Sequence, residues 1–366
     1  MKITIISSTG QCGVHEYARD LSGGLENTGH TVQYIGVKHH DNRDLAKKVH
    51  QVDHDTDLVI IEYEPAIFWL GGLIRIMAWL RFWYKKHILL SVHEIEPKKY
   101  AETRQIQWLL SRPVAENGWF ELFFIIPATL DVMRRFVLLR VGLLCMGRLP
   151  HTVLVHSNKG EENIRLAVSD SNKISSIPLL VKQLATDQAQ ARQTLDLSES
   201  VFSFIMPGFL FRRKQIVEVI QQLPENVDLW VVGTESDNEI GYLDEIKLAI
   251  DASPYPENIK VVLDYDRMEQ YLIAADVAIF YYKDGFQSAA ASLAIGAGKP
   301  CIFSDLSGFA NLHKAGLVAH TSDALHQAMQ TIQQPECYQS LQEQALLLRS
   351  QLAPDQIAKQ YLTIIR

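Results

Sequence analysis

Two short segments in the second half of the chain combine glycine with charged or polar side chains, each directly after a predicted strand. The first is Pro207-Gly208-Phe209-Leu210-Phe211-Arg212-Arg213-Lys214, between a strand expected near 201–206 and a helix expected from about Gln215. Backbone N–H groups at a helix N-terminus and cationic side chains both bind anionic oxygens. Gly208, Arg212 and Lys214 therefore predict a phosphate or diphosphate site, with a solvated basic turn as the alternative.

The second segment is Tyr281-Tyr282-Lys283-Asp284-Gly285-Phe286-Gln287-Ser288-Ala289-Ala290-Ala291-Ser292. It follows a strand expected near 276–281 and opens a helix of small residues that runs to Gly298-Lys299-Pro300. Small side chains permit a close approach of the backbone, and the free N–H groups of the first turn can hold an anion.

In the first half, titratable side chains follow two predicted strands. His93-Glu94-Ile95-Glu96 comes directly after a strand expected near 88–92, and Glu62 and Glu64 stand at the end of a strand expected near 57–62. Parallel sheets place their ligands at the carboxyl ends of the strands, so an imidazole and carboxylates are expected around one crevice. A helix-capping or solvent-facing role for any one of them remains open.

Metal binding is not predicted. No His-Glu-x-x-His motif is present, and the four cysteines stand far apart with no Cys-x-x-Cys pair. Widely spaced cysteines also favour a reducing, cytoplasmic setting.

Glycines also follow the first predicted strand, at 2–7. Gly10 and Gly13 precede a helix expected from about His15 to Asn27. The spacing is not Gly-x-Gly-x-x-Gly, so no dinucleotide fingerprint is present, and this turn either meets a ligand or is an ordinary strand-to-helix turn.

The elements that position these residues alternate along the chain. Short apolar runs bounded by Gly, Pro, Asp or Ser alternate with helical patterns, which indicates parallel βαβ units. The remaining strands are expected near 31–36, 152–156, 228–233, 259–263, 300–303 and 317–319. A polar stretch that runs from Pro178 to about Ser200 predicts a domain boundary near 178.

Composition limits the class of protein. A chain of 366 residues with 47% hydrophobic residues is long enough for two domains, each with its own core. The net charge of −7 argues against nucleic-acid binding through global attraction to phosphate. The segment 1–6 is a predicted strand too short for a signal-peptide core, so secretion is not expected.

Residues 66–150 are unusually apolar, aromatic and basic. The segments 66–86 and 119–150 are interrupted by charges, so neither is expected to span a bilayer. Between 66 and 150, twelve Lys and Arg stand against six Asp and Glu, a local charge of +6, and five of the six tryptophans lie here: Trp69, Trp79, Trp83, Trp108 and Trp119. This pattern favours contact with an anionic membrane surface. The alternative is burial in an internal or oligomer interface.

The order of these motifs resembles the retaining GT-B glycosyltransferases of group 1, also called family 4. The resemblance covers nearly the whole chain, and it is carried by Gly13-Val14-x-Glu16-Tyr17-Ala18-x-x-Leu21, Gly29-His30-x-Val32, Val92-His93, Val153-Leu154-Val155-His156-Ser157, Gly208 to Lys214, Leu229-Trp230-Val231-Val232-Gly233, Ala274-Ala275-Asp276-Val277-x-Ile279, Asp284-Gly285-Phe286 and Gly298-Lys299-Pro300-Cys301-Ile302. The family usually has two glutamates eight positions apart in the last block. Here the matching residues are Asp284 and Ser292, or Leu293 if the helix aligns one residue later.

The resemblance implies an α/β fold of two Rossmann-like, doubly wound domains that face a cleft. Residues 1–178 would form the acceptor-binding domain with basic, apolar, membrane-facing helices, and 179–354 the nucleotide-sugar-binding domain. Residues 355–366 would form a C-terminal helix that crosses back to the first domain. The implied reaction moves a sugar from a nucleotide-diphosphate sugar to a glycan or lipid-linked acceptor, with retention and without a cofactor or metal.

The resemblance also implies roles for individual residues. His93 would contact the donor sugar or the acceptor near the reacting carbon, and Asp284 would bind sugar hydroxyls. The donor diphosphate would meet Gly208, Arg212 and Lys214. The donor sugar and nucleotide would meet a further set: Gly13, Gly285, Phe286, Gln287, Ser288 and Ser292.

Two function classes remain. The first is a membrane-associated transferase of envelope or polysaccharide biosynthesis. The second is a GT-B protein without catalysis that serves as a partner or regulatory subunit, which the replacement of the second glutamate by Ser292 favours. A GT-B epimerase or phosphorylase is less favoured, because the lysine-anchored pyridoxal site of a phosphorylase has no match.

Overall fold

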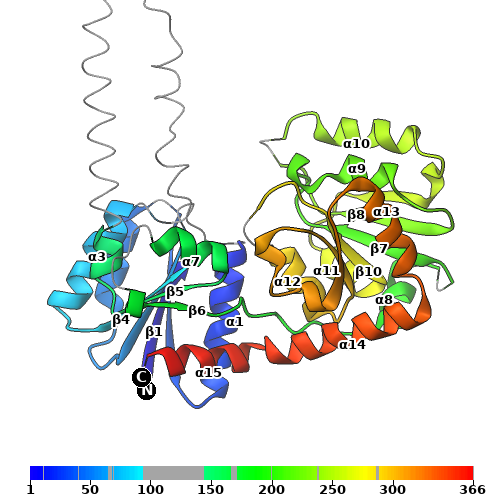
Figure 1. Cartoon of the computed structure of the whole chain (residues 1–366). Coiled ribbons are helices and arrows are strands. Elements are labelled where there is room, and N and C mark those ends of the chain that lie inside the picture. Colours follow the sequence, from blue (N-terminus) through cyan, green and yellow to red (C-terminus); the bar gives the residue numbers. More distant parts are fainter. Residues whose placement is uncertain are drawn as a thin grey trace, which may run out of the picture. The chain divides into compact units, whose positions relative to one another are not determined.

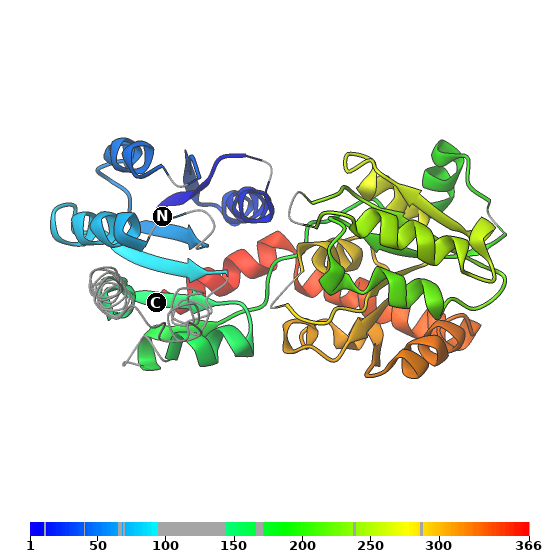
Figure 2. The same cartoon turned by 90° about the horizontal axis from the view of Figure 1, so that it is seen from above.

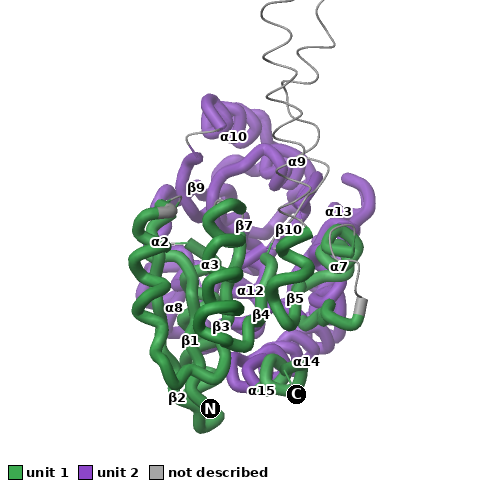
Figure 3. The backbone as a smooth tube through the Cα atoms, turned by 90° about the vertical axis from the view of Figure 1, so that its left-hand side faces the viewer, with its two compact units in different colours: residues 1–177, 359–366 green, residues 178–358 purple. Residues whose placement is uncertain are grey.

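The computed structural model describes residues 1–10, 12–39, 41–64, 68, 70–93, 144–165, 171–198, 200–236, 239–285 and 288–365. The chain forms two compact units (Figures 1 and 3). Unit 1 consists of residues 1–177 and 359–366, and unit 2 of residues 178–358. The first boundary expected from the sequence, at 178, lies one residue from this division, and the second, at 354, lies four residues before it.

Unit 1 is built on a parallel sheet of six strands in the order β2-β1-β3-β4-β5-β6. Its strands are β1 Lys2–Ser8, β2 Thr31–Val37, β3 Leu58–Tyr63, β4 His87–Val92, β5 Thr152–Val155 and β6 Ile174–Ser176. Its helices are α1 Gly13–Asn27, α2 Asn42–Lys48, α3 Leu70–Phe82, α7 Asn158–Arg165 and the end of α15 Pro354–Ile364, with short 3-10 turns at η1 Val49–Gln51 and η2 Ser171–Lys173. Every residue of β3 is buried, as expected for a strand covered on both faces.

Unit 2 repeats this plan with the order β12-β11-β10-β7-β8-β9. Its strands are β7 Phe202–Pro207, β8 Val227–Val232, β9 Ile259–Val262, β10 Val277–Phe280, β11 Cys301–Ser304 and β12 Gly316–Ala319. Its helices are α8 Gln188–Leu195, α9 Ile216–Gln221, α10 Tyr242–Asp251, α11 Met268–Ala274, α12 Ala289–Gly296, α13 Ser322–Thr331, α14 Pro335–Gln351 and the start of α15. Its 3-10 turns are η3 Arg212–Lys214, η4 Pro256–Asn258, η5 Ser307–Phe309 and η6 His313–Ala315.

Both sheets are doubly wound, with helices on both sides of the strands (Figure 2). In unit 1 the chain runs from β1 outward to β2 and then returns past β1 to β3, so the strand order reverses between β1 and β3. In unit 2 the reversal lies between β7 and β10. In such sheets ligands bind outside the carboxyl ends of the strands where the order reverses. The segments after β7 and β10 are the two that the sequence singled out.

The predicted α/β fold of two Rossmann-like units is confirmed, and each strand expected from the sequence is found. Two elements near the domain boundary were missed, β6 before residue 178 and α8 in the polar stretch after it. Strand β6 has only three residues, Ile-Ser-Ser, and is partly exposed. It was missed because this sequence contains no apolar run. Helix α8 is held by polar contacts instead, since buried Arg192 pairs with Asp276 at 2.7 Å.

Most of the apolar basic region lies outside the described residues, including Trp69, Trp108 and Trp119. Within the described ranges, no helix is long and apolar enough to cross a membrane. Arg81 and Lys86, counted as cations of this region, bond to backbone carbonyls of unit 1. Arg81 donates to Leu149, and Lys86 donates to His54 and Thr56.

Candidate functional site

The loop after β7 begins with a glycine that touches the neighbouring strand end. Gly208 has a φ of +92°, and its N–H donates to the carbonyl of Val232 at 2.8 Å. A Cβ added to Gly233 would lie 2.2 Å from the carbonyl oxygen of Gly208. Both positions therefore require glycine, the first for its dihedral angle and the second for the close approach of two backbones.

Lys214 carries a buried cation at this loop. The turn η3 directs its Nζ back to the strand end, where it donates to the carbonyl of Pro207 at 2.7 Å. A Cβ on Gly208 would lie 3.0 Å from this Nζ. Burial, with a smaller contribution from the charge of Arg213, lowers the pKa of Lys214 to about 7. Among the described residues no carboxylate pairs with it, so the site favours an anionic ligand.

Arg213 joins the loop after β7 to the loop after β10. Its guanidinium carbon lies 5.2 Å from the ring centroid of Phe211 and 5.7 Å from that of Tyr282. Its carbonyl accepts the N–H of Lys283 at 2.7 Å, and a Cβ on Gly285 would lie 3.0 Å from its Nη1. Two adjacent cations, Arg213 and Lys214, therefore stand at the reversal of the strand order.

Arg212 has different neighbours. It forms ion pairs with Glu239 at 2.8 Å and Glu245 at 2.5 Å, and it lies over the ring of Tyr242 at 5.1 Å. These partners belong to α10 or to the segment before it. The geometry therefore does not bring Arg212 together with Lys214, and it brings Arg213 there instead.

The remaining predicted residues of unit 2 lie along the loop after β10 and the start of α12. Asp284 is exposed and lines a hollow of about 680 Å³ with Arg212, Arg213 and Lys283. Ser288 caps α12 by accepting the N–H of Ala291, and its Oγ lies 3.4 Å from the Tyr282 hydroxyl. Ser292 is partly buried in the first turns of α12, with its N–H bonded to the Ser288 carbonyl. Phe286 and Gln287 lie outside the described residues.

In unit 1, His93 follows β4 and pairs with the buried Glu62 of β3. Its Nε2 donates to Oε2 of Glu62 at 2.7 Å. The His93 side chain is 10% exposed and that of Glu62 is 0% exposed. Glu62 and Ser91 are register partners on neighbouring strands, which is why a residue just past the end of β4 reaches Glu62.

A larger polar network surrounds this pair. Nε2 of His156 lies 3.0 Å from Oγ of Ser91, and its Nδ1 donates to the carbonyl of Ile177. The Tyr361 hydroxyl of α15 lies 3.2 Å from Oγ of Ser91 and 3.4 Å from Oε1 of Glu62. The Tyr17 hydroxyl of α1 lies 3.0 Å from that of Tyr361. Three neighbouring strands and two helices thus supply one buried network.

The electrostatics of this network keep its phenols protonated. Burial, together with the negative charge of Glu62, holds the pKa of Tyr17 and that of Tyr361 well above the ordinary value. Both hydroxyls therefore retain a proton that they can donate.

Glu62, His93 and His156 are also the kinds of residue that bind metal ions. Their ligand atoms lie within 4.8 Å of one another. The 2.7 Å contact between His93 and Glu62 is a direct hydrogen bond, and both nitrogens of His156 have hydrogen-bond partners. Hydrogen bonds alone account for the short distances among these side chains, so the geometry does not favour a metal ion.

Gly13 begins α1, at the end of the turn that contains Gly10. The N-cap residue Cys12 makes no side-chain hydrogen bond to the first turn, and its Sγ lies 3.0 Å from Oγ of Ser8. The loop thus has a helix N-terminus without a side-chain cap.

Sequence reasoning missed His156 and Tyr361 as members of these clusters, and it chose Arg212 over the adjacent Arg213. His156 follows β5 just as His93 follows β4, so the position after each strand was an available signal. Tyr361 had no local signal, because its partner Glu62 is 299 positions away.

Comparison with known proteins agrees with the fold. No family model matches this chain, and no curated protein matches it in sequence. Among solved structures, HepE from Anabaena in complex with UDP-glucose aligns with a TM-score of 0.68 at 16% identity, over 99% of each chain. Sucrose-phosphate synthase from Thermosynechococcus elongatus aligns at 0.64 and 16% identity, over 100% of this chain and 99% of that one. WaaG, a glycosyltransferase involved in lipopolysaccharide biosynthesis, aligns at 0.58 and 13% identity, over 100% of this chain and 99% of that one. The chain has the GT-B fold.

Proposed function

We propose that this chain is a retaining glycosyltransferase of the group 1, or family 4, type. It moves a sugar from a nucleotide-diphosphate sugar to a glycan or lipid-linked acceptor, in polysaccharide or envelope glycan biosynthesis. The observation that carries the proposal is Lys214, a buried cation whose Nζ has a backbone carbonyl as its partner where the strand order of unit 2 reverses. An anionic diphosphate would supply the negative counter-charge that no carboxylate of the described residues provides.

Unit 2 binds the donor in this proposal. The leaving diphosphate gains negative charge as the bond to the sugar breaks, and Lys214, Arg213 and the backbone at Gly208 stabilise that charge. Arg213 takes the role expected of Arg212, because Arg212 is already paired with two glutamates. The donor sugar and the ribose contact Asp284, Gly285, Ser288 and Ser292. The same role is proposed for Phe286 and Gln287. No cofactor and no metal are required.

Unit 1 binds the acceptor. His93 contacts the sugar or acceptor near the reacting carbon, and the glycine turn at Gly13 admits a ligand close to the backbone. HepE aligns with this chain in its complex with UDP-glucose, so a uridine diphosphate sugar is the first donor to test.

Calorimetric titration with UDP and UDP-glucose, followed by other nucleoside diphosphates, tests the proposal. We expect one nucleotide to bind the wild-type protein, and Lys214→Met to weaken its binding at least tenfold, since one charge-assisted contact is lost. Arg213→Ala and Arg212→Ala form a matched pair, of which the first should weaken binding and the second should not. No binding of any nucleotide would favour the alternative, a GT-B partner or regulatory subunit whose donor site has decayed.

Turnover completes that test. The protein is incubated with the nucleotide sugar that binds and with isolated membrane glycolipids, and release of the nucleoside diphosphate is followed. Transfer that is lost in Lys214→Met supports the transferase. Binding without transfer to any acceptor would favour the regulatory subunit.

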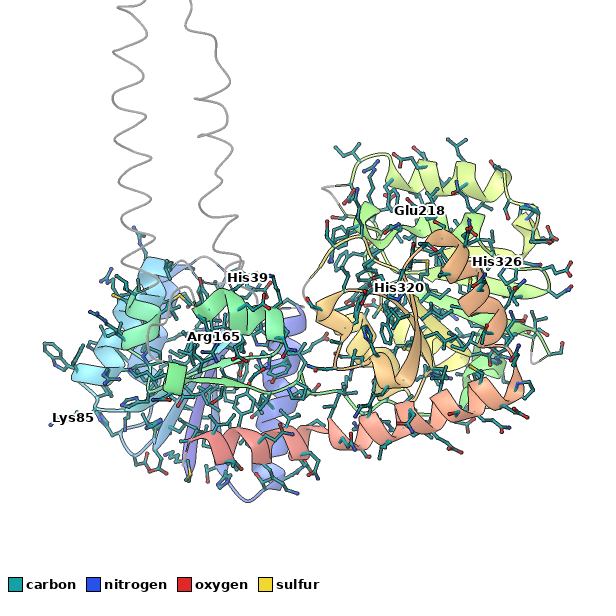
Figure 4. The ribbon with its side chains drawn as sticks, viewed as in Figure 1. His39, Lys85, Arg165, Glu218, His320 and His326 are labelled. Carbon is teal, nitrogen blue, oxygen red and sulfur yellow. The ribbon has the colours of Figure 1, made fainter. Side chains whose placement is uncertain are left out.

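We also propose that the protein is cytoplasmic and peripheral, at the inner face of the membrane. Phe82 and Trp83 at the end of α3 are 65% and 78% exposed, and Lys85 projects from the outside of unit 1 (Figure 4). Exposed aromatic and basic side chains together suit an anionic headgroup layer. Trp79 is excluded from this surface because it packs on His50 with ring centroids 4.4 Å apart.

Flotation with anionic vesicles tests this surface. Replacing Phe82, Trp83 and Lys85 with serine should release the protein, whereas the same three changes at exposed Ile240, Leu248 and Lys247 of unit 2 should not. Unchanged binding of the first variant would contradict the membrane contact. Binding of neutral and anionic vesicles alike would remove the role of Lys85.

A further inference from the structure

The polar network of unit 1 connects His93 with the C-terminal helix. Both carboxylate oxygens of Glu62 are engaged, because Oε2 accepts from His93 and Oε1 accepts from Tyr361. Glu62 and Tyr361 are each 0% exposed, so neither side chain can exchange these partners for bulk water. A buried carboxylate in this setting holds its donors in one arrangement.

The hydrogen-bond directions follow from the chemistry of each atom. A carboxylate is an acceptor, so the His93 proton on this side must be on Nε2. The carbonyl of Ile177 is also an acceptor, so Nδ1 of His156 carries a proton, and in the neutral ring its Nε2 accepts from Ser91. The proton of Tyr361 is then shared between Ser91 and Glu62, and Tyr17 donates to the Tyr361 oxygen.

The rings around His93 restrict its orientation further. Tyr17 meets it edge to face with centroids 4.8 Å apart, and His156 lies at 4.9 Å. Among the described residues, Nδ1 of His93 has no hydrogen-bond partner. With Nε2 committed to Glu62, Nδ1 is the nitrogen left for a ligand.

We propose that Glu62 is a positioning residue that holds His93 in its Nε2–H tautomer with Nδ1 free to accept a hydroxyl proton, and that Tyr361 on the C-terminal helix holds Glu62. The ligand group at Nδ1 is then a hydroxyl donor, such as a sugar hydroxyl. This inference rests on the proposed function for the identity of that ligand, but its geometry can be tested without turnover.

The first test is the tautomer of His93, read from the ¹⁵N chemical shifts of its two ring nitrogens at a pH where the ring is neutral. The signals are assigned by their loss in His93→Gln. We expect Nε2–H in the wild-type protein, a mixture of tautomers in Glu62→Leu, and partial rescue in Glu62→Gln, whose amide oxygen can still accept. Tyr84→Phe, a change outside the network, should leave the shifts as they are.

The result that overturns the proposal is equally direct. An Nδ1–H tautomer in the wild-type protein contradicts it, and so does an unchanged tautomer in Glu62→Leu. If Glu62→Leu does not fold, Tyr361→Phe decides in its place, because loss of its hydroxyl should broaden or shift the His93 signals while leaving the fold intact.

The second test separates positioning from donor binding. Glu62→Leu should lower kcat/KM about 10- to 100-fold, since a misplaced catalytic group costs about that much, while the Kd for the nucleoside diphosphate changes less than about twofold. Tyr361→Phe should show the same pattern with a smaller loss. Unchanged kcat/KM in a Glu62→Leu protein that has lost the tautomer would overturn the role of Glu62 in catalysis. If the wild-type protein transfers no sugar, the proposed function fails, whereas the tautomer still decides whether Glu62 positions His93.

Discussion

The carboxyl edges of the two sheets hold buried ionisable side chains in opposite states of pairing. In unit 1 the buried Glu62 has donors at both oxygens, all from its own unit. In unit 2 the buried Lys214 donates to the carbonyl of Pro207, and no carboxylate of the described chain pairs with it. The same architectural position therefore supports a completed network in one unit and an incompletely neutralised charge in the other.

Inside unit 2, two buried cations also differ in their pairing, and the difference separates a structural role from a ligand-binding role. Arg192 is as deeply buried as Lys214, at 6% exposure each. Arg192 pairs with Asp276, and it also donates to Ser203 and to the carbonyl of Ala274. Asp276 and Ser203 lie at the amino ends of β10 and β7, the edge opposite to the candidate site. A buried cation with a complete set of partners holds the fold, whereas one with an incomplete set is suited to a ligand.

The largest expected effect is the loss of stability when the paired cation Arg192 is replaced. Arg192→Met leaves the partly buried carboxylate of Asp276 without its ion-pair partner, which costs about 3–5 kcal/mol of unfolding free energy. Urea denaturation followed by circular dichroism measures it. The double variant with Asp276→Leu should recover part of the loss, because the carboxylate left without its arginine is then removed as well. A loss below about 1 kcal/mol in the single variant would mean that this pair resembles an exposed one.

Lys214→Met should change stability in the other direction, in a way that depends on pH. The lysine has a pKa of about 7 in the folded protein, below its ordinary value, so between about pH 7 and 10 the unfolded chain binds a proton that the folded protein does not. Wild-type stability therefore falls as the pH is lowered through this range, and the methionine variant escapes this loss.

The measurement is the difference in unfolding free energy between Lys214→Met and the wild-type protein, without nucleotide, from about pH 6 to pH 9. As the pH falls to about 7, the difference should shift by up to a few kcal/mol in favour of the variant. Below that pH it should level off. Nucleoside diphosphate should shift the difference back toward the wild-type protein at neutral pH, because it binds the protein with the lysine more tightly than the variant. A difference that does not depend on pH would show that Lys214 keeps its ordinary charge and that the contrast with Glu62 is wrong.

A smaller effect is expected when one member of the completed network is removed. Tyr361→Phe leaves Glu62 and Ser91 each without one hydrogen bond, at a cost of about 1–2 kcal/mol. Thermal unfolding measures it, and Tyr84→Phe, whose ring packs on Trp79, is the control. If Tyr361→Phe is as stable as the wild-type protein, the hydrogen bonds of the Tyr361 hydroxyl do not stabilise unit 1, and the network is not complete.

How far the sequence predicts these features depends on how local their causes are. The strands were found because each is a short apolar run, and Glu62, His93 and Lys214 were singled out because each lies at or after a strand end. Helix α8 was missed because Arg192 and Asp276 stabilise it across 84 positions. Tyr361 was missed for the same reason. Long-range polar pairs leave no periodic pattern, so a single sequence does not reveal them.

The smallest expected effect concerns the two adjacent arginines, which composition alone does not distinguish. Their directions are set by η3, where one turn sends Arg212 toward Glu239 and Glu245 and Arg213 toward Gly285. Arg212 is 42% exposed, and solvent screens exposed ion pairs, so Arg212→Ala should change stability little. Its effect on nucleotide affinity should stay below about twofold, while Arg213→Ala weakens affinity about tenfold, the loss of one charge-assisted contact. Titration of both variants with the same nucleotide checks this. Equal losses would mean that Arg212 leaves its glutamates when the ligand binds, and that the contrast between paired and unpaired cations does not hold at the surface of the site.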